Sequence, residues 1–548
     1  MLNWIVSLYG LLSVLLHGLV LSTQSLTLGG VVFLLVVVSP TSNLPDSIGN
    51  SILRWVRRWA LLLALAEILY VALDIAILMQ SGGFAFSEVI SANFALAGLL
   101  ASTSALAIAI VASVERLRGR AGLLVPSALI LIAATMTSHA AARLDHRLPL
   151  GILTAVHQAA TAAWIGGLPH LLISLKRVST PRMKREICIK FSRLAMFSVG
   201  ALVAAGIGLT KFYVGSWDAT FGSTYGIMVV GKVFLFGILL SLGALNFRIV
   251  RQMLSGAQSH VDFLRQFGEA EIGVGFTVIL LAASLTSLAP SVDTPQLTLP
   301  TAGVVARLAP QWPPKIISGG QIAPYGNDKS PAALAAMRTA VTETLTLSEV
   351  SETGGSFEVW WMDDPHHWAA LDVIEVGLLA LLAHSRRLQY ARNWPLLFPA
   401  LGLILFLMSD SQYWPLGADS LWSSFRDPVV LPHRLIEILI ALFGIFEWRV
   451  QTQRVASLNA GLVFPGLVAV CGTLLLAHSH GAADLQVQPE LLSETSHVSI
   501  AILGVAGGWS RWLELRLPSI DRTRYVMSWI WPICFLLVGI LLASYQGS

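Results

Sequence analysis

The chain has 548 residues, of which 55% are hydrophobic and 12% are charged, and its formal net charge is +4. A soluble globular domain carries about 25% charged residues, so this composition excludes an ordinary soluble enzyme and predicts a polytopic membrane protein. The three cysteines, Cys188, Cys471 and Cys534, are isolated in sequence. Without a CxxC pair, a thiolate metal site or a soft-metal ATPase is not expected.

Apolar blocks recur along the chain at close to the length of about 20 residues that crosses a bilayer as a helix. They predict an all-α fold, a transmembrane helical bundle of about fourteen spans. In chain order these are 5–37, 59–80, 94–114, 121–139, 150–175, 192–213, 225–247, 269–289, 367–385, 395–409, 431–448, 460–478, 493–510 and 526–545.

A polar, proline-rich segment separates the eighth predicted span from the ninth. We therefore expect three parts: an eight-span membrane domain over 1–291, an extracytoplasmic loop over 292–366, and a six-span membrane domain over 367–548. Clusters of Arg and Lys occupy alternate loops, and the positive-inside rule assigns those loops to the cytoplasm and both termini to the other side. Because hydrophobic spans separate the basic clusters, they do not predict nucleic-acid binding.

A histidine motif occurs twice. The first copy is Ser138-His139, followed by His157 and Gly166-Gly167, and the second is Ser479-His480, followed by His497 and Gly507-Gly508. In each copy one histidine ends an apolar segment and another lies near the start of the next. Ionisable side chains are costly inside a bilayer, so they are functional candidates by default. Imidazoles that gather near the non-cytoplasmic face predict a metal or haem site.

Nearly all of the candidate metal ligands lie on the outer side of the predicted spans, and His17 lies mid-span in the first. The candidate ligands are His17, Met136, His139, His146, His157, His433, His478, His480 and His497. Imidazole suits copper, zinc, iron and nickel, and a thioether narrows the choice toward Cu(I). Asp74, Trp164, Lys232 and Glu437 are candidates for lining a transport path.

These side chains also have structural interpretations. A membrane histidine such as His17 or His170 can be a hydrogen-bond partner between helices, and glycine pairs commonly allow close helix packing. Asp74 and Lys232 can form a structural ion pair or a proton relay, and the sequence does not separate these two roles.

Residues 1–291 resemble the CopD/PcoD family of bacterial copper-resistance inner-membrane proteins. The resemblance rests on the two histidine segments and several later motifs. These are Ser138-His139-Ala140, His157 through Trp164-Ile165-Gly166-Gly167-Leu168, Phe191-Ser192-Arg193-Leu194-Ala195, Thr224-Tyr225-Gly226 with Lys232, Asn246-Phe247-Arg248, and Glu269 with Glu271. It implies eight spans, passage of copper across the cytoplasmic membrane toward the cytoplasm, and a periplasmic partner of the CopC type. The six-span half is an addition to that pattern, and the sequence contains no histidine-led CopC-like β-sandwich.

Two functions are weighed. The first is a copper transporter rather than an enzyme, located in the bacterial inner membrane with the lipid bilayer and copper ions as partners. The sequence has no complete Gly-x-x-x-x-Gly-Lys-Ser/Thr P-loop and no Asp-Lys-Thr-Gly motif, so an ion gradient, the membrane potential or protons would drive transport. The alternative is a b-type haem electron carrier or oxidase-assembly protein. His17 with His157, or His433 with His497, would then ligate the haem.

Overall fold

The computed structural model describes the chain in thirteen stretches. They are 9–41, 45–114, 120–254, 261–295, 298–302, 304, 369–384, 388–408, 412–415, 417–427, 430–476, 487–518 and 521–543. The chain divides into two compact units, of which one comprises Met1–Val304 with Leu462–Trp531 and the other Val305–Gly461 with Pro532–Ser548.

The first unit is built from long helices. In chain order its elements are α2 (Tyr9–Phe33), η1 (Leu34–Val38), α3 (Asp46–Ser81), α4 (Phe86–Ile90), α5 (Asn93–Ser113), α6 (Arg120–Met136), α7 (His139–Ala142), α8 (Arg147–Thr161), η3 (Ala162–Gly166), α9 (Gly167–Arg177), α10 (Pro181–Tyr213), α11 (Trp217–Gly222), α12 (Thr224–Leu254), α13 (Val261–Thr286), η5 (Ser291–Asp293), α21 (Val463–Leu475), α22 (Val487–Arg516) and the first part of α23 (Arg522–Ala543). A helix satisfies its own backbone hydrogen bonds, which an apolar bilayer requires.

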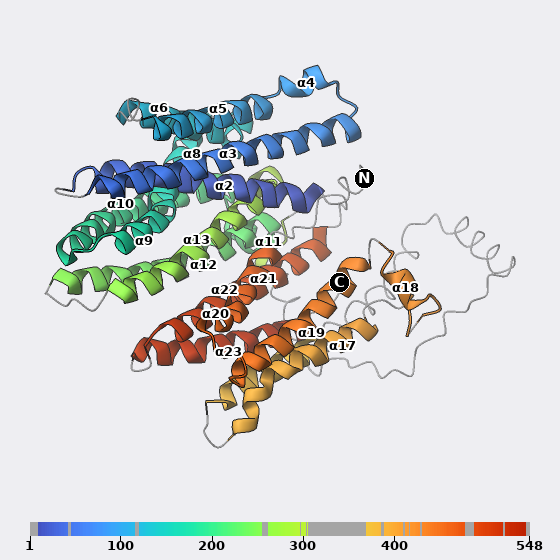
Figure 1. The fold of residues 1–548 in the computed structure, drawn as a ribbon. Coiled ribbons are helices and arrows are strands. Elements are labelled where there is room, and N and C mark those ends of the chain that lie inside the picture. Colours follow the sequence, from blue (N-terminus) through green and yellow to red (C-terminus); the bar gives the residue numbers. More distant parts are fainter. Residues whose placement is uncertain are drawn as a thin grey trace, which may run out of the picture. The chain divides into compact units, whose positions relative to one another are not determined.

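Helix α2 is the central element of this unit and packs against both α3 and α13 (Figure 1). It also contacts η3, a π-helical turn between α8 and α9. The two backbones approach closely there, since a Cβ on Gly166 would lie 1.8 Å from the Ser25 carbonyl oxygen and one on Gly29 would lie 2.3 Å from the Ala162 carbonyl oxygen. Gly166 is therefore a close-packing residue.

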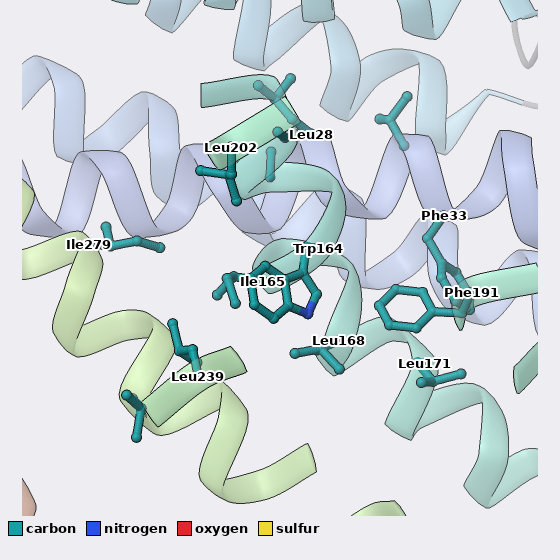
Figure 2. Packing of buried hydrophobic residues seen from close by; sticks show 14 of the residues in the cluster. Leu28, Phe33, Trp164, Ile165, Leu168, Leu171, Phe191, Leu202, Leu239 and Ile279 are labelled. Carbon is teal, nitrogen blue, oxygen red and sulfur yellow. The ribbon is translucent and has the colours of Figure 1, made fainter. Parts of the chain in front are cut away.

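The hydrophobic core of the first unit surrounds this contact. Figure 2 shows the Trp164 indole among Ile165, Leu168 and Phe191, and these four side chains are buried. The core joins α2, η3, α9, α10, α12 and α13 into one continuous cluster.

Helices α21 and α22 complete the first unit, although they come from the C-terminal part of the sequence. The Glu269 carboxylate accepts hydrogen bonds from Arg516 Nη2 at 2.8 Å and Nε at 3.1 Å. Further along α13, the hydroxyls of Thr277 and Thr473 lie 2.7 Å apart, and Ser284 Oγ donates to the Leu476 carbonyl at 2.6 Å. The pair α21–α22 is thus fixed to α13 at several levels.

The second unit contains the helical segment 369–382, η7 (Gln389–Leu396), α17 (Leu397–Met408), α18 (Leu421–Ser424), α19 (Leu431–Gln451), α20 (Leu458–Gly461) and the remainder of α23. Helices α17 and α19 pack together at Gly402, where a Cβ would lie 2.8 Å from the Glu437 carbonyl oxygen. Gly539 of α23 approaches the backbone of 369–382 equally closely.

Ten helical segments among the described residues are long and apolar enough to cross a membrane, and no named β-strand occurs within those residues. The polytopic all-α fold class is therefore confirmed. The count of fourteen spans and the division at 291 and 367 stay predictions. The predicted domains follow the composition of the sequence, whereas the two units are defined by how compactly the residues pack. By packing, Leu462–Trp531 belongs to the same unit as residues 1–304.

Candidate functional site

The candidate site consists of three groups of polar side chains at successive depths along the helices, which we call levels. The first level is a histidine–tyrosine cluster of His17, Tyr70, His139, Tyr213 and Tyr225. His139 begins α7 directly after the N-cap residue, and its ring meets those of Tyr213 and Tyr225 edge-on, with centroid distances of 5.9 and 6.3 Å. His17 on α2 stacks on Tyr70 at 5.1 Å and lies near enough to His139 to interact with it electrostatically. The cluster thus collects α2, α3, α7, α10 and α12.

His139 is suited to bind a metal ion as a neutral ligand. Burial lowers its pKa from the usual value, while the Leu285 backbone and Asp293 act in the opposite direction. Its Nε2 is buried and makes no hydrogen bond within the described stretches. A neutral imidazole nitrogen without a partner is the form that ligates metals.

A charged loop lies beside this cluster. Arg143, four residues after His139, forms ion pairs with Asp145 at 3.3 Å and with Asp293 at 3.4 Å. The hydrogen bond from Arg143 lowers the pKa of the Asp145 carboxyl and holds it ionised. Asp293 therefore contributes negative charge near His139 while it ties the loop to the end of α13.

The second level consists of His157 and Lys232. His157 on α8 interacts electrostatically with Lys232 on α12, and its Cε1 lies 4.0 Å from where a Cβ on Gly206 would be. Its Nδ1 is buried without a hydrogen bond among described residues. One residue further, Gln158 Oε1 accepts from Gln24 Nε2 of α2 at 3.3 Å.

The two levels are separated by about two helical turns. The neighbours of His139 on α10 and α12 are Tyr213 and Tyr225, whereas those of His157 are Gly206 and Lys232. Seven residues at a rise of 1.5 Å correspond to about 10 Å. Imidazole nitrogens lie about 2 Å from a bound ion, so a separation of about 10 Å is too large for His139 and His157 to share one ion. Among the described residues no group of three or more His, Cys, Asp or Glu side chains could hold a metal ion.

The third level is a network centred on Glu271. Trp164 Nε1 donates to Glu271 Oε1 at 2.7 Å, and Asn246 Nδ2 donates to Oε2 at 2.5 Å. Glu271 lies fifteen residues before Thr286, whose Oγ1 is 3.2 Å from His17 Nδ1. At the helical rise this separation is about 22 Å. The three levels therefore follow one another along the bundle.

A cavity of about 290 Å³ adjoins the third level. Its walls include Trp164, Leu172, Phe191, Asn246 and Glu271. Glu271 is only 2% exposed, and most of the other residues in the cavity wall are apolar. Glu271 belongs to a motif of the resemblance, but no sequence pattern predicts a role for it.

Asp74 and Lys232 occupy different surroundings. Asp74 accepts a hydrogen bond from Tyr9 at 2.9 Å, one turn from Tyr70 on α3. Lys232 lies at the second level with His157. No ion pair joins Asp74 and Lys232 within the described stretches. The tyrosines of the first level were not among the predicted site residues.

The remaining candidates are dispersed. His146 is exposed, with φ of 54°, and its ring lies 5.2 Å from that of Phe212, while Met136 ends α6 and is 36% exposed. Glu437, in the second unit, pairs with the fully buried Arg434 at 3.3 Å.

The second histidine motif is only partly described. His497 lies on α22 in the first unit, next to Val498, which packs where a Cβ on Gly231 would point. His433 lies on α19 in the second unit. His478 and His480 lie outside the described residues.

Comparisons with known proteins point to copper. The family model "Copper resistance protein D" (CopD) matches residues 185–285, which contain most of α10, all of α12 and most of α13. The chain is 29% identical over 162 residues to the "Copper transport protein CutJ" of Bacillus subtilis (strain 168). That match covers 29% of this chain and 29% of the relative. No solved structure matches. The resemblance to the CopD family is confirmed over residues 185–285, which include Tyr225, Lys232, Asn246 and Glu271.

Proposed function

We propose that this chain transports copper ions across the bacterial cytoplasmic membrane and that the first unit carries the path. The observation that carries the proposal is the succession of buried polar levels along one bundle, with His17 and His139 first, His157 and Lys232 second, and Glu271 third. The match to a copper-resistance family over residues 185–285, which contain Tyr225, Lys232 and Glu271 but none of the three histidines, supports copper as the transported ion.

Charge indicates how the bundle is oriented in the membrane, and the family resemblance implies transport toward the cytoplasm. The basic residues Lys176 and Arg177 end α9, and Arg251 lies in the last turn of α12. The positive-inside rule assigns that end of the bundle to the cytoplasm. The histidine–tyrosine cluster then faces the outside with both termini, and copper moves from His139 toward Glu271. A periplasmic CopC-type protein is the proposed donor of the ion.

Transient binding suits this geometry. The first level offers two imidazoles, the second offers one and the third offers a single carboxylate, instead of the three or four ligands of a structural metal site. An ion held by few ligands is released readily, as transport demands. The haem alternative stays a prediction without a supporting contact, because His17 lies seven residues before Gln24 and therefore about 10 Å from the level of His157.

The test is copper uptake by the full chain in proteoliposomes. His139→Ala and His157→Ala are expected each to abolish uptake, because each removes a separate level. His146→Ala is the matched control, since His146 is exposed and belongs to no level. Uptake that continues unchanged in a His139/His157 double Ala variant would refute the proposal. A Soret band with a reducible α-band in the purified protein would favour haem instead.

A further inference from the structure

The Glu271 carboxylate has hydrogen-bond donors but no cation partner among the described residues. The carboxylate receives two N–H donors, one on each oxygen, which is the arrangement that stabilises its ionised form. No cation is paired with Glu271 in the described stretches, and the cavity walls contain no Lys, Arg or His. An ionised carboxylate removed from water costs several kcal/mol unless a cation compensates it.

The charged groups on neighbouring helices are engaged elsewhere. Arg265 and Arg516 bind Glu269, which lies on another face of α13. His170 of α9 has its Nδ1 2.9 Å from the Gly166 carbonyl oxygen. Lys232 lies eleven residues before Gly243, which borders Glu271, and so about 16 Å away along α12. Cys188 of α10 is the other titratable side chain in the described cavity wall.

Asn246 can serve Glu271 in two states. As oriented, its Nδ2 donates to the carboxylate, and its Oδ1 is buried without a hydrogen bond among described residues. A primary amide carries a donor and an acceptor of nearly identical shape. If Glu271 takes up a proton, a turn of the amide lets Oδ1 accept the new O–H. Both protonation states of Glu271 then keep a partner.

The cavity also provides a route to the carboxylate. Its walls extend to Val250, four residues before the end of α12, and to Leu264, three residues after the start of α13. It therefore reaches from Glu271 to the basic end of the bundle. Protons can enter along such a route without passing the histidine levels.

We propose that Glu271 is a proton-exchange site that couples proton movement to copper movement. In the absence of copper the carboxylate binds a proton from the cavity, forming an O–H bond. When copper reaches the third level, its positive charge replaces that of the proton, which leaves through the cavity. No electron is transferred, and a single carboxylate exchanges a single proton for each Cu(I). This proposal rests on the proposed transport function.

The test measures copper and protons separately. The full chain is reconstituted in vesicles that contain a pH-sensitive dye, and a Cu(I) salt is added outside. We expect uptake accompanied by a transient proton flux at the basic end, because copper displaces the proton of Glu271 through the cavity and a proton rebinds once copper has left, and we expect loss of that flux in Glu271→Gln. Glu186→Gln is the control, because Glu186 is also a carboxylate at the basic end but is paired with Lys190 at 2.7 Å. Glu271→Asp, which keeps a carboxyl group, should recover part of the flux.

An infrared measurement distinguishes the possible failures. The difference spectrum between acidic and alkaline buffer contains the C=O bands of all the carboxyl groups that titrate, and one component of it should be lost in Glu271→Gln and shifted in Asn246→Leu. Copper uptake without proton flux in the wild type, or a flux and band that persist in Glu271→Gln, would overturn the coupling. A band that behaves as expected without any copper uptake would overturn the transport function but leave Glu271 as a proton site.

Discussion

The close contact between α2 and η3 predicts that Gly166→Ala destabilises the protein. The added Cβ would lie 1.8 Å from the Ser25 carbonyl oxygen, whereas ordinary contacts begin near 3.4 Å, so the backbones would have to separate by about 1.6 Å. Overpacking of this kind costs about 1–3 kcal/mol. Gly29 shares the interface and offers no side chain that could yield.

The assay is thermal unfolding of the detergent-solubilised full chain, followed by tryptophan fluorescence. At about 2–4 °C per kcal/mol for a medium-sized domain, the midpoint should fall on the order of 5 °C. Gly151→Ala is the matched control, because it lies in adjacent α8 and its Cβ would meet nothing within 4 Å. Equal midpoints for the two variants would refute the close-packing argument.

Three further predictions concern charge and protonation. Glu269→Gln should weaken the attachment of α22, because the bidentate contact with Arg516 is lost, and lower the unfolding midpoint; a double-mutant cycle with Arg516→Gln should show coupling of about 1–3 kcal/mol. Copper binding at His139 should persist below the pH at which an ordinary histidine is protonated, because burial lowers the pKa of His139, and it should weaken with further acidification. A copper titration against pH in His157→Ala measures this. Binding that begins to weaken above pH 6.5 would contradict the expectation. Asp293→Asn should leave His139 easier to deprotonate, so copper binding in that background should extend to still lower pH.

The sequence was sufficient for the fold class because apolar runs of bilayer length have few other solutions. The hydropathy pattern underestimated the length of several helices. The span expected at 192–213 is the second part of α10, which begins at Pro181, and that expected at 59–80 is the second part of α3, which begins at Asp46. Hydropathy does not register the polar turns with which these helices continue beyond the apolar stretch.

Depth within the bundle was harder to predict. His139 and His157 are eighteen residues apart in sequence, on either side of a short loop, which suggested a shared ion. The structure separates them because His157 lies ten residues into α8, which begins at Arg147, whereas His139 lies in the short helix α7 before it. Glu271 gains its significance from Trp164 and Asn246, which are distant in sequence and meet it only through tertiary packing.

The distribution of the first unit over two sections of the chain limits how the protein can be shortened. A polypeptide that stopped after residue 304 would retain all three levels of polar side chains but would lack α21 and α22. Gly231 and Gly273 would then lose Val498 and Trp509, which occupy the space above them, and Arg516 would no longer neutralise Glu269. We therefore expect the eight N-terminal spans, expressed alone, to need the separately supplied C-terminal part for assembly.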